Sequence, residues 1–163
     1  MGRRRDDHIL LTSAALGAVA GMRSMAAPAL LSHEMAEHPL HDVESRLEHL
    51  LSSERVAQLL SLFAGGEMLA DKAPFVPDRT SSVPLLGRAL MGSLTAAAFA
   101  VHRRHPVFMP AVVGAASAIA STYGAYHLRR LSHEHLNVPD RLLGLIEDAV
   151  VVAMSKAIME SME

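Results

Sequence analysis

A chain of 163 residues with a net charge of −2 is long enough for one domain with a single core, and its overall charge gives it no attraction to nucleic acid. Half of the residues are apolar, only 4% are aromatic, and cysteine is absent, which excludes disulfides, thiolate nucleophiles and Cys-ligated zinc. Arginines are scattered along the chain rather than clustered, so a nucleic-acid partner is not expected. Alternating β-branched runs are missing, and we therefore expect an all-α fold.

Five apolar stretches predict a small polytopic membrane bundle, formed as one domain over residues 1–163. The strongest stretch, 106–128, holds twenty-three residues without Asp, Glu, Lys or Arg, and about 20 such residues cross a bilayer as a helix. In chain order the stretches are 9–31, 56–70, 85–101, 106–128 and 142–159. The mean hydropathy of +0.23 is low for such a protein, and a soluble all-α bundle with Ala-rich buried helices is the alternative.

The N-terminal sequence resembles a secretory signal. A basic segment, MGRRRDDH, precedes the apolar run ILLTSAALGAVAG and the small residues at 24–26. Asp6 and Asp7 in the basic segment, and Arg23 beside the cleavage site, argue against removal. We therefore expect an uncleaved first span.

Polar segments separate the apolar stretches. Residues 33–53 are polar and acidic, and within them Asp42–Leu51 (DVESRLEHLL) carries its apolar residues on one side of a helix. This spacing predicts an amphipathic helix on the membrane surface. Residues 73–84 contain three prolines and predict a loop.

Basic residues favour a cytoplasmic N-terminus when they are counted by the positive-inside rule. Five spans then leave HRRH at 102–105 on the outer side, against the rule. The predicted inner arginines are Arg3, Arg4, Arg5, Arg79, Arg129, Arg130 and Arg141, and the outer ones are Arg46, Arg55, Arg103 and Arg104.

An internal repeat relates the two ends of the chain. Small residues recur with one spacing at 17–27 and 114–124, and Leu-Ser-His-Glu recurs at 31–34 and 131–134. A single span separates the two copies, so the halves 9–72 and 106–159 would lie antiparallel in the membrane. Such an inverted repeat places a binding site between its halves. Chance similarity in an Ala/Ser/Gly-rich chain is the alternative.

Charged residues inside apolar stretches are the most informative feature of the sequence. Each would cost about 2.5–3.5 kcal/mol in a bilayer unless it met a partner or a polar cavity. Glu67 and Asp71 share a helix face and must therefore share a proton, hold a cation or meet a base. The candidate bases are Lys72, Arg23 and Arg88, and a second acidic pair, Glu147 and Asp148, occupies the last stretch.

The helix rise predicts where these groups meet. With the N-terminus inside, Glu67 and Glu147 lie in the cytoplasmic half of the membrane, close together at an inward-opening cavity. Arg88 is their expected cation, and Arg23 is expected roughly 8 Å or more above them. The alternative is that the charges are buried pairs that only lock the helices together.

Histidines form a looser group. His33, His38, His41 and His49, with His133 and His135, could assemble a metal site. Their spacings match no metal motif, so the sequence leaves metal binding open and indicates no cofactor.

Four segments together resemble the bacterial membrane protein family called domain of unknown function 4126. They are GAVAGMRSMAAPALL, GEMLADKAPFVPDRT, GAASAIASTYGAYHLRR and PDRLLGLIEDAVVV, between Gly17 and about Val152. The resemblance implies an integral protein of the bacterial inner membrane and supplies no activity. It also implies a signature polar set of Arg23, Glu67, Asp71, Lys72, Arg79, Glu147 and Asp148.

The leading functional hypothesis is a small transporter or channel-like protein whose polar centre binds an ion or a small polar solute. A membrane scaffold or accessory subunit, including a homo-oligomer, is the second hypothesis, because Gly17-x-x-x-Gly21 and Ala116-x-x-x-Ala120-x-x-x-Gly124 suit close helix contact. An enzyme acting on lipid head groups is the third, although no nucleophile or metal motif supports it.

Overall fold

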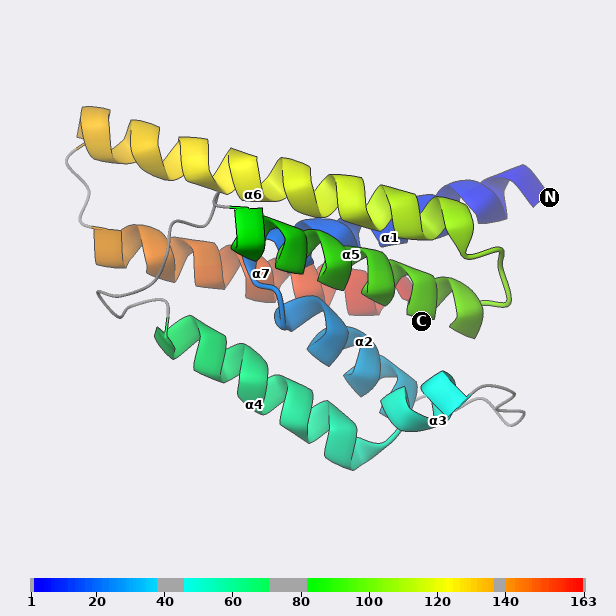
Figure 1. Ribbon diagram of the computed structural model, residues 1–163. Coiled ribbons are helices and arrows are strands. Elements are labelled where there is room, and N and C mark those ends of the chain that lie inside the picture. Colours follow the sequence, from blue (N-terminus) through cyan, green and yellow to red (C-terminus); the bar gives the residue numbers. More distant parts are fainter. Residues whose placement is uncertain (1, 38–45, 71–81, 137–139, 163) are drawn as a thin grey trace.

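The computed structural model describes residues 2–37, 46–70, 82–136 and 140–162, and these residues contain helices and no strand, which confirms the all-α prediction (Figure 1). The helices are α1 (Gly2–Met22), α2 (Ala26–Glu37), α3 (Arg46–Leu51), α4 (Glu54–Ala70), α5 (Ser82–His102), α6 (Phe108–Leu136) and α7 (Asp140–Met162).

Two helices of the described chain are long and apolar enough to cross a membrane. They are α5 over Ser82–His102 and the part of α6 over Phe108–Ser132. They match the predicted spans 85–101 and 106–128. The stretches 56–70 and 142–159 coincide with α4 and α7.

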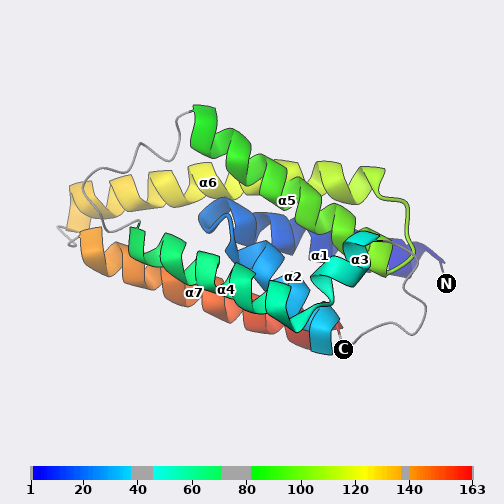
Figure 2. The ribbon, with the colours of Figure 1, turned by 60° about the horizontal axis from the view of Figure 1, so that its bottom comes forward.

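The predicted span 9–31 is wrong as a single helix. The chain ends α1 at Met22 and starts α2 at Ala26, and α2 then turns back from the middle of the bundle (Figures 1 and 2). Pro28 explains the break, because proline has no N–H for the carbonyl of Ser24 and its ring would collide with that carbonyl in a continuous helix. In the first turn of α2 the same proline is tolerated.

Helices α1 and α6 run side by side in the same direction. A Cβ added at Gly17 would collide with the backbone of Gly114, and one added at Gly21 would collide with Ala118 and Ser121. In both contacts, equivalent positions of the two small-residue segments meet each other. The repeated segments therefore pack on each other in parallel. The structure therefore does not support the inverted repeat, in which they would be antiparallel.

The ends of the bundle also differ from the expected topology. Asp6 Oδ1 lies 3.1 Å from His105 Nε2, and Arg5 donates a hydrogen bond of 3.2 Å to the carbonyl of Arg103. The HRRH segment therefore lies at the same end as the N-terminus, whereas five simple spans would separate them by a membrane. The α1–α2 hairpin is the reason, because it reverses the chain once more than a single span does.

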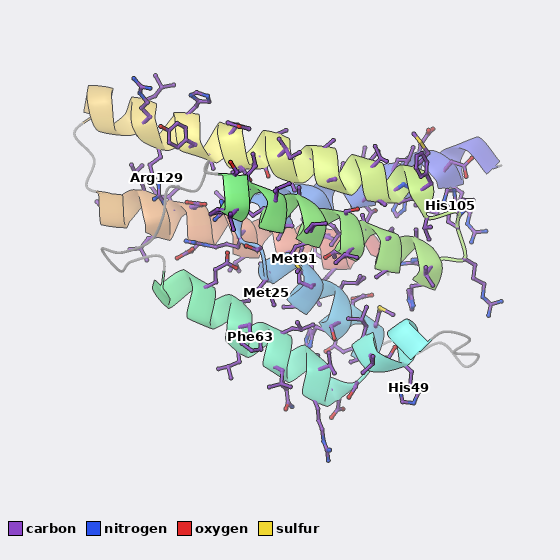
Figure 3. The ribbon with its side chains drawn as sticks, viewed as in Figure 1. Met25, His49, Phe63, Met91, His105 and Arg129 are labelled. Atoms are coloured by element: carbon purple, nitrogen blue, oxygen red, sulfur yellow. The ribbon has the colours of Figure 1, made fainter. Side chains whose placement is uncertain are left out.

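Small and polar residues share the interior with a core of larger apolar residues such as Leu16, Leu31 and Phe99, and many other large apolar side chains lie on the outside. Thr95, Ala96 and Ala98 of α5 are buried, whereas Leu86, Leu90 and Leu94 of the same helix are about 60% exposed. Phe63 of α4 projects from the outer face of the bundle (Figure 3). So many exposed large apolar side chains are unusual in a soluble protein.

Helix α3 corresponds to the second half of the predicted amphipathic helix. It packs against α2, α4 and α5, with Leu51 against the core and Leu50 exposed. Residues 42–45 of that prediction lie outside the described residues.

Candidate functional site

The break between α1 and α2 leaves backbone donors that Glu67 satisfies. The N–H groups of Ser24 and Met25 donate to its carboxylate at 3.0 and 2.9 Å, and the Ser24 hydroxyl donates at 2.8 Å. A carboxylate is the favoured group at this position, because free N–H groups and the positive end of the helix dipole meet there. Glu67 of α4 thereby caps the start of α2.

The other side of the break leaves acceptors at the end of α1. The carbonyl of Gly21 would bond to Met25 in a continuous helix, but it accepts hydrogen bonds from Arg88 Nη1 at 3.2 Å and from the Thr122 hydroxyl at 2.9 Å. Arg88 comes from α5 and Thr122 from α6. A cation at a helix C-terminus complements the dipole as Glu67 does at the N-terminus.

Arg23 lies within the break and points to α7. Its guanidinium meets Asp148 through Nε at 2.9 Å and Nη2 at 2.5 Å. The Arg23 side chain is only 1% exposed and that of Asp148 is 16% exposed. The carboxylate therefore compensates a positive charge that has been almost completely removed from water.

A second ion pair joins α6 to α7. Arg129 Nη2 lies 2.8 Å from Glu147 Oε2, and Figure 3 shows Arg129 extending from α6 towards α7. The sequence predicts Arg129 only as a charge that flanks a span, not as a partner of Glu147. A signal was present, because Arg129 and Glu147 are equally far in sequence from position 138, the middle of the link between two antiparallel helices.

The described charges interact as one group. Arg88 is attracted by the opposite charges of Glu67 and Glu147 and repelled by the like charges of Arg23 and Arg129. The structure thus brings together five of the eight predicted residues, namely Arg23, Glu67, Arg88, Glu147 and Asp148. Arg88 as the direct cation of Glu67 and Glu147 stays a prediction, because its guanidinium donates to the Gly21 carbonyl while Glu147 pairs with Arg129. Arg23 joins the same group through Asp148. Asp71, Lys72 and Arg79 lie outside the described residues.

The histidine group is only partly described. His33 lies 3.3 Å from Glu37, and His49 is exposed. Among the described side chains no three His, Asp or Glu residues are grouped closely enough to hold a metal ion. His38, His41, His133 and His135 are not among those side chains.

A cavity of about 330 Å³ adjoins the charged group between α6 and α7, and Met22 of α1 also belongs to its lining. Its walls are mainly apolar, and Arg129 and Glu147 belong to its lining. The charged group therefore borders a space large enough for a small ligand.

Fold and site together define an all-α bundle whose broken first helix is held by charged groups from α4, α5 and α7 and by the Thr122 hydroxyl of α6. The chain belongs to the family described as Domain of unknown function (DUF4126), whose model matches residues 10–160. This agrees with the family that the four sequence segments resemble. No curated protein and no solved structure matches the chain.

Proposed function

We propose that the protein is an integral membrane protein of the bacterial plasma membrane in which α4, α5, α6 and α7 each cross the bilayer and α1 and α2 enter it as a hairpin. The family membership and the two long apolar helices support this proposal. The exposed apolar side chains of α4 and α7, such as Leu62, Phe63, Ile146 and Val152, support it as well. Large apolar side chains exposed in this number need a cover, and a bilayer supplies one.

We further propose that the charged centre binds a small polar solute or an ion and carries it across the membrane. The observation that supports this most directly is the break between α1 and α2, whose ends face Glu67, Arg88 and Asp148. Discontinuous helices with charged partners near the middle of a membrane form the binding sites of many transporters. Charges kept there at such cost usually mark a pathway.

Flux through reconstituted protein tests the proposal. Proteoliposomes would receive concentration jumps of sodium, potassium, chloride, phosphate or glycine on a solid-supported membrane, and the transient current would be recorded. We expect at least one solute to give a current that Asp148→Asn and Glu67→Gln reduce more than tenfold. The matched controls, Glu160→Gln and Glu54→Gln, change exposed acids away from the break and should keep the current.

The measured currents can be interpreted only when the variants fold correctly. If both site variants reconstitute as folded protein and conduct like the wild type, the charges serve helix packing alone. If no solute produces a current in the wild type, the transport proposal is wrong.

A scaffold role is the second candidate, and one face of α6 favours it. Ala116, Ala120 and Gly124 are exposed along this helix and suit contact with another helix. The Gly17 and Gly21 face offers no such surface, because α6 already covers it. Oligomers in nanodiscs that Ala120→Leu converts to monomers would support this role, and a wild-type monomer would argue against it.

A further inference from the structure

The cavity between α6 and α7 is formed by two facing helical stripes. Gly124, Ala125 and Leu128 line it from α6, and Leu143, Ile146 and Val150 line it from α7. Along α6 the lining extends from Ser121 to Ser132, which is about 16 Å at 1.5 Å per residue. The space is therefore long, narrow and apolar.

Its size suits one hydrocarbon chain. A volume of about 330 Å³ lies at the lower end of ligand pockets and is about twice that of an engineered cavity that holds benzene. A two-chain phospholipid needs more room. The bilayer around α6 and α7 would supply single-chain amphiphiles directly.

The charged residues in the wall of the cavity favour a ligand whose polar end is anionic. Arg129 is 28% exposed, and its guanidinium has five N–H donors, so it can bind a ligand oxygen while it holds Glu147. Arg129 and Glu147 form a neutral pair in the wall. Arg130, which is exposed at the next position of α6, adds a positive charge near this end of the cavity.

We infer that this cavity binds a single-chain carboxylate amphiphile of the fatty-acid type, with its carboxylate on Arg129 and its chain between α6 and α7 towards Met22. A carboxylate matches the fork of the guanidinium, and the apolar stripes receive the chain. The inference depends on the proposed membrane location but not on solute transport at the helix break.

Photolabelling in nanodiscs tests the site. A dodecanoate carrying a diazirine would be incorporated into phosphatidylcholine nanodiscs with the wild-type protein, irradiated, and mapped by mass spectrometry. We expect labels on the cavity faces of α6 and α7 and at least fivefold less labelling with excess unlabelled dodecanoate.

Two variants test separately how the apolar cavity binds the hydrocarbon chain of the ligand and how the charged pair binds its carboxylate. Gly124→Phe should fill the cavity and reduce labelling at least fivefold, whereas Gly87→Phe on α5 should keep it, because a Cβ at either glycine meets no other atom. The double change Arg129→Gln/Glu147→Gln removes both charges together. It should weaken labelling by the carboxylate at least fivefold and leave labelling by the matching diazirine alcohol unchanged.

Uniform labelling of the lipid-facing surface, or equal labelling of wild type and folded Gly124→Phe, would overturn the inference. A photoreactive phospholipid that labels the cavity more strongly than dodecanoate would overturn it too. Currents measured on the same preparations keep the two proposals apart. Cavity labelling without any current would support the fatty-acid site and contradict solute transport. Currents without cavity labelling would support solute transport and contradict the fatty-acid site.

Discussion

At the scale of single residues, Arg23 depends strongly on its carboxylate partner. It is almost fully buried and meets Asp148 at 2.5 Å, and removing one partner of a buried ion pair costs about 3–5 kcal/mol. We expect Asp148→Asn to lower the free energy of unfolding in detergent by about 3 kcal/mol, measured by denaturant titration. The control is Lys156→Gln, because Lys156 and Glu160 form only an exposed pair at 4.0 Å, and it should change stability very little.

The double variant Arg23→Met/Asp148→Leu separates stability from function. Apolar replacement of both partners is often neutral or stabilising, so most of the lost stability should return. Recovered stability without recovered current would assign the pair to transport. Asp148→Asn that unfolds like the control would contradict the buried-pair interpretation.

The identity of the charged residues was predictable, but their pairing was not. Arg23, Glu67, Arg88, Glu147 and Asp148 stand out because charges in apolar stretches need partners. Which acid meets which base depends on helix rotation and on the position of the break. Sequence spacing therefore favoured Arg88 over Arg23 as a direct partner, whereas Arg88 donates to a backbone carbonyl and Arg23 binds the carboxylate.

At the scale of elements, Glu67 fixes the start of α2. Glu67→Ala would leave two backbone N–H groups and the Ser24 hydroxyl without this acceptor, and loss of a helix cap costs about 0.5–2 kcal/mol. We expect faster hydrogen exchange of the Ser24 and Met25 amides, read by NMR or mass spectrometry, with α5 unchanged. Glu54→Ala, an exposed acid at the start of α4, is the control, and equal exchange in both variants would rule out the capping role.

The three-helix contact of α1, α5 and α6 depends on glycine. A Cβ on Gly114 would collide with the Gly92 carbonyl and lie 2.6 Å from the Cβ of Ala96. We expect Gly114→Ala to destabilise the bundle by about 1–3 kcal/mol through overpacking, measured as a lower melting temperature in detergent. Gly124→Ala on the same helix should stabilise it by up to about 1 kcal/mol, since only helix propensity changes there. Equal shifts for the two variants would contradict close packing at Gly114.

The helices themselves were largely predictable, and the break was not recognised. Apolar stretches located α4, α5, α6 and α7 because a bilayer-length run of apolar residues favours a helix. The stretch 9–31 has the same composition throughout, and composition does not show that Pro28 ends a helix rather than bending it. The capping groups that make the break stable come from residues far along the chain, such as Glu67 and Thr122.

At the scale of the whole molecule, the hairpin of α1 and α2 determines which loops lie at the same end of the bundle. The N-terminus and the HRRH segment lie at one end of the bundle, and the last part of α6, which carries Arg129 and Arg130, lies towards the other (Figure 1). When the basic residues are grouped by these two ends, HRRH lies at the same end as Arg3, Arg4 and Arg5. It therefore no longer violates the positive-inside rule. In the proposed membrane placement, a cytoplasmic N-terminus puts Arg129 and Arg130 on the outer side, opposite to the five-span expectation.

Single cysteines can report this arrangement without background, because the chain has none of its own. In inverted and right-side-out vesicles, we expect Asp7→Cys and Arg104→Cys to react with an impermeant maleimide from the cytoplasmic side, and Arg130→Cys to react from the other. Leu94→Cys should react from neither side, since its 60% exposed side chain would face lipid. Labelling of Asp7→Cys and Arg104→Cys from opposite sides would restore five simple spans and refute the hairpin. Reaction of Leu94→Cys from either side would show water where the proposed bilayer should be.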